Sequence, residues 1–508
     1  MKQRCLTPLG LTPWLLALAA IGSACEELGI ESPNPEDPNR FIHAVPSEEV
    51  DDTPADASFE AGQRRSVADA DVTLTLAAAS PAPFTTEYAL GVVMPGDLDG
   101  DGVDDLVTYG YQQAPSDVIF DHCEGESCPA FVRLSVHIFY GADAARLEPS
   151  AQLLGSWVHN WRLWVEAAGD IDGNGRQDLL ISEGARGSQA NVRVLRGGPR
   201  LAGRRDIREV TSLIRETEAG VGLHLAAGLG DLDGDGKGDF VVDRRGLDQA
   251  LVFYGDLLDP ERRSEADADL RIEGAGVLRP VGDINGDQIP DVVSFSSSEL
   301  PRVGEAEWRV LLGRRAVSGP FFELAAVIPG ALLVASLGDV DGDGLNDLGV
   351  SREQDCFVLA GRRVWPERIE DADARLRWAP TSTATFSALS VRAAGDVNGD
   401  GHEDLAYVDP NHGPDGRGAV HLYLGPLDLT QAELDPGSSS TLIGQAWRGQ
   451  NDFGPIGLEA LGGWGWLGGF GFVGGSDLDG DGYDDMALLG FSPRGANDSH
   501  LYLWRGRP

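Results

Sequence analysis

The stretch Asp231-Leu232-Asp233-Gly234-Asp235-Gly236-Lys237-Gly238-Asp239 is a nine-residue loop rich in carboxylates. Asp occupies positions 1, 3, 5 and 9, and glycines at positions 4 and 6 permit the tight positive-φ turn that points the carboxylates inward. Calcium binds about six to eight hard oxygens, and this loop offers four carboxylates and the carbonyl oxygen of Lys237 at position 7. The loop is therefore predicted to bind calcium.

The loop occurs seven times, and the copies begin at Asp97, Asp170, Asp231, Asp283, Asp339, Asp396 and Asp477. Successive starts are 73, 61, 52, 56, 57 and 81 residues apart, and such periods are typical of a solenoid, a propeller or an array. The predicted calcium ligands, at positions 1, 3, 5, 7 and 9 of each copy, are Asp97, Asp99, Asp101, Val103, Asp105, Asp170, Asp172, Asn174, Arg176, Asp178, Asp231, Asp233, Asp235, Lys237, Asp239, Asp283, Asn285, Asp287, Ile289, Asp291, Asp339, Asp341, Asp343, Leu345, Asp347, Asp396, Asn398, Asp400, His402, Asp404, Asp477, Asp479, Asp481, Tyr483 and Asp485.

An EF-hand shares the opening carboxylates of this loop, but it needs a bidentate Glu at position 12 between two helices. Position 12 is not acidic in any copy; its residues are Thr108, Ile181, Val242, Ser294, Val350, Tyr407 and Leu488. The residues after each loop are also apolar and typical of strands. The ligand set is therefore predicted to end at position 9 of a hairpin, in preference to an EF-hand or to acidic turns without metal.

Each unit carries a second marker, an apolar strand that ends in Gly; the seven glycines are Gly141, Gly197, Gly255, Gly313, Gly361, Gly425 and Gly506. A fourth strand follows, as at 269–272 and 375–378. Four-stranded units repeated around an axis form a β-propeller. We predict an all-β fold, a seven-bladed propeller over residues 67–508 with a calcium-binding hairpin loop in every blade.

The seventh unit ends after its third strand, so a strand from the N-terminus is predicted to complete it. Residues 64–72 match residues 262–270, which lead into a fourth strand, at seven of nine positions. Residues 70–78 are therefore expected to pair with 501–504. This pairing closes the ring and removes an exposed sheet edge.

The pattern Gly-Asp-hydrophobic-Asp/Asn-Gly-Asp-Gly-x-x-Asp-Leu resembles the FG-GAP repeat of integrin α-subunit propellers and of bacterial FG-GAP/VCBS proteins. The resemblance covers about residues 88–508, with Leu90-Gly91 in place of a Phe-Gly pair. Integrin propellers carry the metal loop in only some blades, whereas all seven units carry it here. The resemblance implies that ligands bind on the face away from the calcium hairpins, and it supplies no residue motif for ligand contact.

Strand alternation places the loops between second and third strands, and the crossings between blades, on the face opposite the calcium loops. Long insertions fall there, at 110–131, 411–418 and 441–466, together with the crossing 155–164. Aromatic side chains in such loops can stack on sugars or anchor a protein. The ligand-face candidates are Trp157, Trp161, Trp447, Phe453 and Trp464. The alternative is that several tryptophans belong to the core, above all Trp164 and Trp466.

The first 24 residues are expected to be a signal peptide, with Lys2 and Arg4 before an apolar stretch at 9–21. Cys25 follows small residues and resembles the lipidated Cys of a bacterial lipobox, although the Leu usual three positions earlier is Gly22. Lipidation at Cys25 is the preferred interpretation and simple secretion the alternative. Residues 25–66, acidic and rich in Pro, are expected to form a disordered tether.

The chain has 508 residues, a formal net charge of −41 and five Cys. This acidity argues against nucleic acid or an anionic membrane as partner. Cys123 and Cys128 are predicted to form a local disulfide, and Cys356 to be a buried apolar residue. No nucleophile, zinc or phosphate-loop motif is found, so we predict a non-enzymatic, monomeric, calcium-dependent adhesion module for a protein or glycan. The alternatives are an enzyme acting on extracellular polysaccharide and a structural envelope protein.

Overall fold

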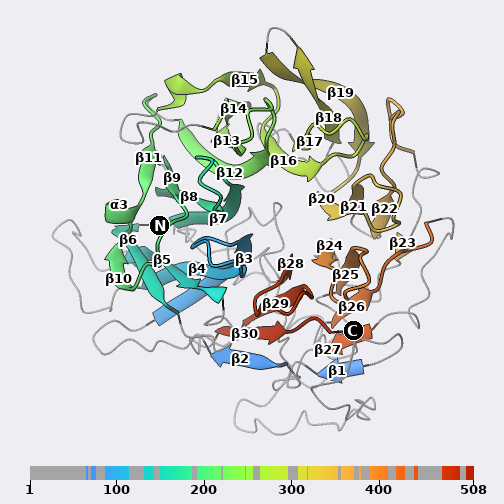
Figure 1. Ribbon diagram of the computed structural model, residues 1–508. Coiled ribbons are helices and arrows are strands. Elements are labelled where there is room, and N and C mark those ends of the chain that lie inside the picture. The colour runs from blue at the N-terminus through green and yellow to red at the C-terminus, as the bar shows by residue number, and fades with distance from the viewer. Residues whose placement is uncertain are drawn as a thin grey trace, which may run out of the picture. The chain divides into compact units, whose positions relative to one another are not determined.

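The computed structural model contains seven sheets, each built on four antiparallel strands (Figure 1). In six of them the four strands follow one another in the chain, and in the seventh the fourth strand comes from the N-terminus. The structure describes residues 64–66, 70–75, 86–113, 131–141, 149–159, 161–185, 191–218, 221–245, 247–255, 264–295, 307–316, 319–352, 356–370, 377–378, 390–409, 419–429, 440–443, 472–491 and 499–507, all within the unit Asp51–Pro508.

The first strands of blades one to seven are β3 (Thr86–Gly96), β7 (Trp161–Gly169), β12 (Gly222–Gly230), β16 (Val277–Gly282), β20 (Leu333–Gly338), β24 (Ser390–Gly395) and β28 (Phe472–Ser476). The second strands are β4 (Asp105–Gln113), β8 (Asp178–Ala185), β13 (Asp239–Arg245), β17 (Asp291–Phe295), β21 (Asp347–Ser351), β25 (Asp404–Asp409) and β29 (Asp485–Phe491). The third strands are β5 (Phe131–Phe139), β9 (Asn191–Leu195), β14 (Gln249–Phe253), β18 (Glu307–Ala316), β22 (Cys356–Leu359), β26 (Ala419–Tyr423) and β30 (Ser499–Trp504).

The fourth strands are β6 (Ala151–His159), β11 (Ser212–Ile214), β15 (Leu270–Glu273), β19 (Gly319–Pro329), β23 (Arg377–Trp378), β27 (Ser440–Ile443) and, in blade seven, β2 (Val72–Thr75). The connection between the third and fourth strands carries β10 (Gly203–Asp206) and the helical turn α3 (Ile207–Val210) in blade two, and the turn η2 (Glu265–Asp267) in blade three. Strand β10 pairs parallel with β6 of blade one. Each first strand contacts the first strand of the next blade, and β28 contacts β3. The seven blades therefore form a closed ring, and the predicted seven-bladed β-propeller is confirmed (Figure 1).

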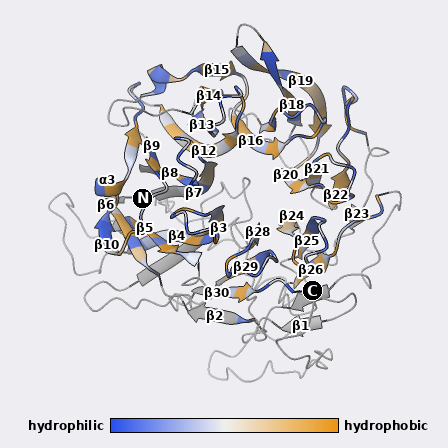
Figure 2. Cartoon of the chain, in the orientation of Figure 1, coloured by the Kyte–Doolittle hydropathy of each residue, from blue (hydrophilic) through white to orange (hydrophobic). Residues whose placement is uncertain are grey.

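The core lies between neighbouring blades, where strands present apolar side chains to one another. All five residues of β17 and of β21 are buried, as expected for strands covered on both faces. Phe240 and Phe253 stack with ring centroids 5.1 Å apart between second and third strands of blade three. Hydrophobic residues concentrate on the strands and hydrophilic ones on many of the connecting loops (Figure 2).

The N-terminal strand β2 pairs antiparallel with β30, with Val72 opposite Leu503 and Leu74 opposite Leu501 (Figure 1). This is the register expected from the match between residues 64–72 and 262–270. That the strand is required to hold the ring closed stays a prediction.

The same match is visible in the side chains. Asp71 accepts a hydrogen bond from the backbone N–H of Arg505 at 2.8 Å, and Asp269 accepts one from that of Tyr254 at 2.8 Å. Both donors directly precede the Gly that ends a third strand. Asp71 therefore occupies in blade seven the place of Asp269 in blade three.

The folded region begins earlier than expected. Arg64–Ser66 form strand β1, which pairs parallel with β27 of blade six, although the sequence suggested a tether up to residue 66. The corresponding contact in blade three is a parallel bridge from Ser264 to Arg215 of blade two. Three backbone residues at a neighbouring sheet edge carry too weak a pattern to be recognised as a strand.

Two tryptophans expected in a crossing loop lie in strands. Trp157 belongs to β6 and Trp161 begins β7, with a single residue between the strands. Their side chains lie outside the described parts of the chain. Trp164 is buried against Leu225 and Val277, as the core alternative predicted. Cys356 is buried at the start of β22, also as predicted.

Candidate metal sites

Each nine-residue loop joins the first strand of a blade to its second, and its last residue begins that second strand. This Asp at position 9 is at most 1% exposed in all seven blades. One carboxylate oxygen accepts the backbone N–H of position 2, as from Val340 to Asp347 at 3.0 Å. The other accepts the N–H of the Gly that ends strand three, as from Gly361 to Asp347 at 2.8 Å.

The terminal Gly, recognised in the sequence only as the end of a strand, therefore holds the loop to the third strand. The bond from this Gly to position 9 occurs in every blade, at 2.6–2.9 Å. A Cβ on Gly361 would lie 2.6 Å from the carbonyl oxygen of Asn346 in the adjoining loop, so a larger residue does not fit.

The first carboxylate of each loop organises the turn, and loop five shows the pattern. Asp339 accepts backbone N–H groups from Gly342 at 2.8 Å, Asp343 at 3.0 Å and Gly344 at 2.8 Å. Gly342 and Gly344 have φ of 77° and 85°, which only glycine adopts readily. The backbone thus fixes the position 1 carboxylate inside the loop without using a metal.

Ligand oxygens at positions 1, 3 and 9 converge to within 4.8 Å of one another in five loops, those starting at Asp97, Asp170, Asp231, Asp339 and Asp477. Loops four and six have Asn285 and Asn398 at position 3, so they offer two carboxylates and an amide oxygen there. Convergent carboxylate oxygens are the donors that hard divalent cations prefer. The loops can therefore hold a divalent metal.

Burial raises the pKa of the position 9 carboxyls, and neighbouring loop carboxylates add to the shift while the two backbone N–H donors oppose it. The pKa reaches about 7 at Asp105, Asp291, Asp347, Asp404 and Asp485. It reaches about 6 at Asp178 and Asp239. Without a metal, these carboxyls still carry part of their protons near neutral pH.

Calcium is therefore expected to stabilise the protein more at pH 8 than at pH 5. Because folding raises these pKa values, the proton-linked stability is complete below about pH 4 and is lost as pH rises toward about 7. A bound cation offsets that loss. The check is the melting temperature of protein stripped on a chelating resin, measured with and without calcium from pH 5 to 8. The same calcium-induced gain at every pH would contradict the linkage.

Neighbouring loops contact one another around the ring. The backbone N–H at position 8 donates to the position 1 carbonyl of the preceding loop at 2.7–3.2 Å, in the pairs Gln177–Asp97, Gly238–Asp170, Asn346–Asp283, Asp484–Asp396 and Asp104–Asp477. The last pair connects loop one to loop seven. A hydrogen-bonded series thus links the candidate metal sites across blade boundaries.

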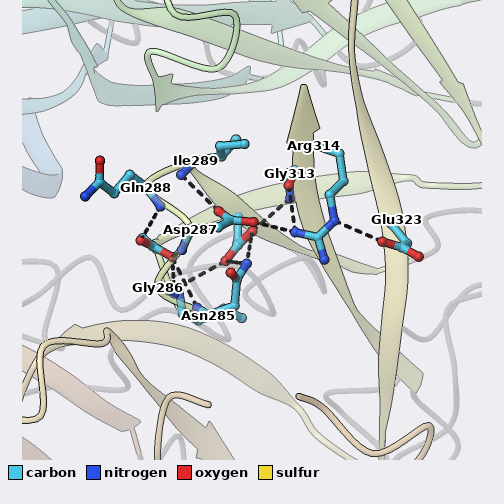
Figure 3. A network of polar contacts seen from close by, with 11 residues as sticks. Asn285, Gly286, Asp287, Gln288, Ile289, Gly313, Arg314 and Glu323 are labelled. Carbon is cyan, nitrogen blue, oxygen red and sulfur yellow. Dashed lines mark hydrogen bonds and ion pairs between the residues drawn. The ribbon is translucent and has the colours of Figure 1, made fainter. Parts of the chain in front are cut away.

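Loop four departs from the others (Figure 3). The amide of Asn285 donates to both carboxylate oxygens of Asp291, at 3.3 and 3.0 Å. Arg314 forms an ion pair with Asp287 and another with Glu323. Gln288 adopts φ of 65° at a position that is Gly in the other six loops, so the positive-φ strain expected from the sequence is present.

The link from loop four to loop three also differs. Position 8 is Pro290, which has no N–H to donate to the carbonyl of Asp231. Arg315 replaces it, donating to the carbonyl oxygens of Asp231 at 2.7 Å and Leu232 at 2.8 Å. A side chain from strand three therefore connects loops three and four, where Pro290 cannot donate a backbone hydrogen bond.

Loop four is expected to be the weakest calcium site, and Gln288→Gly is expected to strengthen it by relieving backbone strain of about 1 kcal/mol, roughly fivefold in affinity. Site occupancy in crystals grown at limiting calcium, read from anomalous scattering, measures the order of filling. The matched control is Gly236→Gln at the same position of loop three, where φ is 89°, and it should weaken that site. Loop four filling as early as loop three would refute the ranking.

Sequence reasoning missed Arg200. Its guanidinium, carried on the segment after strand three of blade two, forms ion pairs with Asp99 and Asp101 of loop one. The partners are about 100 residues apart, so no spacing could have revealed the contact. A metal in loop one must share these carboxylates with Arg200 or displace it. The imidazole of His402, at position 7 of loop six, is half-buried and lies beside Gly342 of the preceding loop.

Several predicted sites lie outside the described residues: Trp447, Phe453, Trp464, Trp466, Cys25, Cys123 and Cys128. The signal peptide and most of the tether lie outside them too. In the described portion of the chain, no helix has the length and hydrophobicity needed to cross a bilayer.

No protein-family model matches the chain. Over 252 residues it is 28% identical to integrin alpha-PS2 of Drosophila melanogaster, which covers 46% of this chain and 16% of that protein. Over 176 residues it is 30% identical to integrin alpha-4 of Xenopus laevis, covering 34% of this chain and 15% of that protein. The similarity thus spans about a sixth of the length of either relative.

Among solved structures, the chain is similar to a periplasmic gluconolactonase of Pseudomonas aeruginosa. The two are 13% identical in sequence with a TM-score of 0.36, and the match covers 72% of this chain and 91% of the gluconolactonase. A likeness at this level carries no argument about function.

Proposed function

From an integrin-α-like seven-bladed propeller, we propose that the chain is a calcium-stabilised binding or adhesion module. The observation that carries the proposal is the repetition of one carboxylate loop at the same place in every blade, with its ligand oxygens converging in five of them. Metal-loaded loops would stiffen one end of the ring. The other end is then left for recognition.

Calcium suits these loops better than magnesium does. Calcium accepts about six to eight oxygens in flexible geometry, whereas magnesium requires a near-octahedral shell and keeps several waters. The loops offer carboxylates, a carbonyl oxygen at position 7 and, in three copies, an Asn side chain. We assign up to seven calcium ions to the propeller on this basis.

Strand order supports the choice of ligand face. The metal loop joins strands one and two of each blade, so the loops between strands two and three emerge at the opposite end of the antiparallel sheet. The ligand-face candidates Trp447, Phe453 and Trp464 belong by sequence to a crossing between blades at that end. We assign recognition of a protein or glycan to this face, on a monomer held at the cell surface by lipidated Cys25.

The test is binding to arrays of glycans and of extracellular matrix proteins, in calcium and after chelation. A triple variant with Trp447, Phe453 and Trp464 changed to Ala should lose binding at unchanged melting temperature. Its control is Phe321→Ala, an aromatic on β19 that is 44% exposed. If the triple variant still binds the ligand, the assignment of recognition to this face is wrong. Unsaturated products from polyuronides would show instead that the chain is a lyase.

A further inference from the structure

A cavity of about 500 Å³ lies on the axis of the ring, lined by residues from the first strands of all seven blades. Its apolar lining includes Val92, Met94, Val165, Val334 and Phe472. The size is within the range of pockets that hold small organic ligands, about 300–1,000 Å³. None of the lining residues is a predicted metal ligand or a ligand-face candidate.

Three charged side chains also line the cavity: Glu166 of β7, Arg279 of β16 and Arg392 of β24. Arg279 and Glu166 form an ion pair at 3.1 Å. One negative and two positive side chains leave the described part of the lining with one unbalanced positive charge. The next carboxyl that interacts with Arg279 is Asp243, whose pKa burial raises to about 7, so it supplies only part of a counter-charge at neutral pH.

Arg392 is the unbalanced cation. Its Nε and Nη2 are buried and have no hydrogen-bond acceptor among the described residues. Burial and the neighbouring Arg279 lower the pKa of Arg392 to about 10, while Glu166 opposes the shift, so the guanidinium stays charged at neutral pH. Buried charged N–H groups without an acceptor are strongly unfavourable, and a compensating anion would relieve the cost.

The chain itself shows what such a guanidinium edge binds. Arg244 uses its Nε and Nη2 to hold the carboxylate of Glu216 side-on, at 2.8 and 2.9 Å. This two-point geometry matches the two oxygens of a carboxylate and favours it over a spherical anion. Among the residues that the structure describes, the same two nitrogens of Arg392 have no hydrogen-bond acceptor.

We propose that the central cavity is a binding site for a small monocarboxylate, held side-on by Arg392, with its apolar body against the valine, methionine and phenylalanine side chains of the first strands. The apolar lining disfavours inorganic sulfate or phosphate, which would remain strongly hydrated. One carboxylate balances the one excess charge. This proposal does not depend on the binding function proposed for the face opposite the metal loops.

Hexanoate is the probe, titrated by calorimetry into the full calcium-loaded chain, with acetate and octanoate to vary the apolar body. Hexanamide and sulfate are the neutral and the inorganic controls. Hexanoate should bind at least about tenfold more tightly than either, since hexanamide lacks the charge-assisted two-point contact and sulfate lacks the apolar body. Arg392→Gln should weaken the binding of hexanoate at least about tenfold. The control is Arg204→Gln on exposed β10, which should leave the affinity for hexanoate unchanged.

A second variant keeps the proposal testable if Arg392→Gln does not fold. Glu166→Gln removes the only negative side chain of the lining as described, so hexanoate should bind several-fold more tightly. The ¹⁵Nε–H resonance of Arg392 should move on titration. Equal affinity in Arg392→Gln, unchanged affinity in Glu166→Gln, or no binding of any of the three carboxylates would overturn the proposal and show that water or the chain itself satisfies the guanidinium.

Discussion

Chelation of divalent metal with EGTA is expected to lower the melting temperature by about 10 °C. Extracellular calcium modules have dissociation constants of about 10⁻⁴–10⁻³ M, and a tenfold excess of ligand adds roughly 1.4 kcal/mol for each site. Seven such sites contribute roughly 10 kcal/mol, comparable with the whole stability of a typical domain, about 5–15 kcal/mol. An unfolding entropy of about 2.1 cal/mol/K per residue over roughly 440 residues converts this to about 10 °C.

The metal-free loops explain why the effect should be this large. Five of them bring three carboxylates to within 4.8 Å of one another, and the position 9 carboxyl of each is buried. Their mutual repulsion opposes the folded hairpin unless protons or a cation compensate. Scanning calorimetry in EGTA and after return of calcium or magnesium measures the effect. An unchanged melt in EGTA would falsify a structural role for the metal.

A single-site variant locates the contribution of one loop. Asp347→Asn keeps the size of the side chain but removes one carboxylate and places an N–H donor near Val340 and Gly361, both of which donate to Asp347. The variant should melt lower in calcium and differ less from the parent in EGTA. The same difference in both conditions would mean that Asp347 acts through its hydrogen bonds alone.

The propeller and its loops could be predicted because they depend on local spacing repeated seven times. Asp and Gly positions within nine residues determine the turn, and the Gly at the end of strand three is visible as a second periodic marker. The pairing of β2 with β30 was accessible for the same reason, since Asp71 repeats the role of Asp269.

The contacts that the sequence could not reveal join residues from different blades. Arg200 reaches loop one from blade two, Arg315 replaces the donor that Pro290 lacks, and Arg392 meets Glu166 and Arg279 only because the ring closes. Each of these contacts depends on the position of a guanidinium at the end of a long side chain. The sequence spacing of an Arg does not indicate that position. Strand β1 escaped recognition because only three residues pair.

Deleting residues 26–63 is expected to leave the melting temperature unchanged, whereas extending the deletion to residue 78 should lower it sharply and cause aggregation. The short deletion spares β1 and β2. The long one removes both, and exposes the backbone of β30, which pairs with β2 from His500 to Leu503. An unpaired apolar edge strand is a template for association with other chains.

Two further variants separate the contributions of the N-terminal segment. A deletion of 26–69 removes β1 but keeps Asp71 and β2. If closure depends on β2, this deletion should lower the melting temperature only slightly. Asp71→Ala removes the acceptor for the N–H of Arg505 and the ion pair with Arg507, a loss of about 1–3 kcal/mol. Asp269→Ala is the matched control, because it removes the same backbone bond from a blade whose four strands are consecutive.

Light scattering and calorimetry on this series decide how the ring is held. Because β28 contacts β3 through the first strands, the ring has one contact between its ends that no N-terminal deletion removes. If both long and short deletions stay monomeric with the same melting temperature, that inner contact is sufficient and β2 only covers an edge. If the long deletion alone unfolds or aggregates, the pairing of the two chain ends holds blade seven in place.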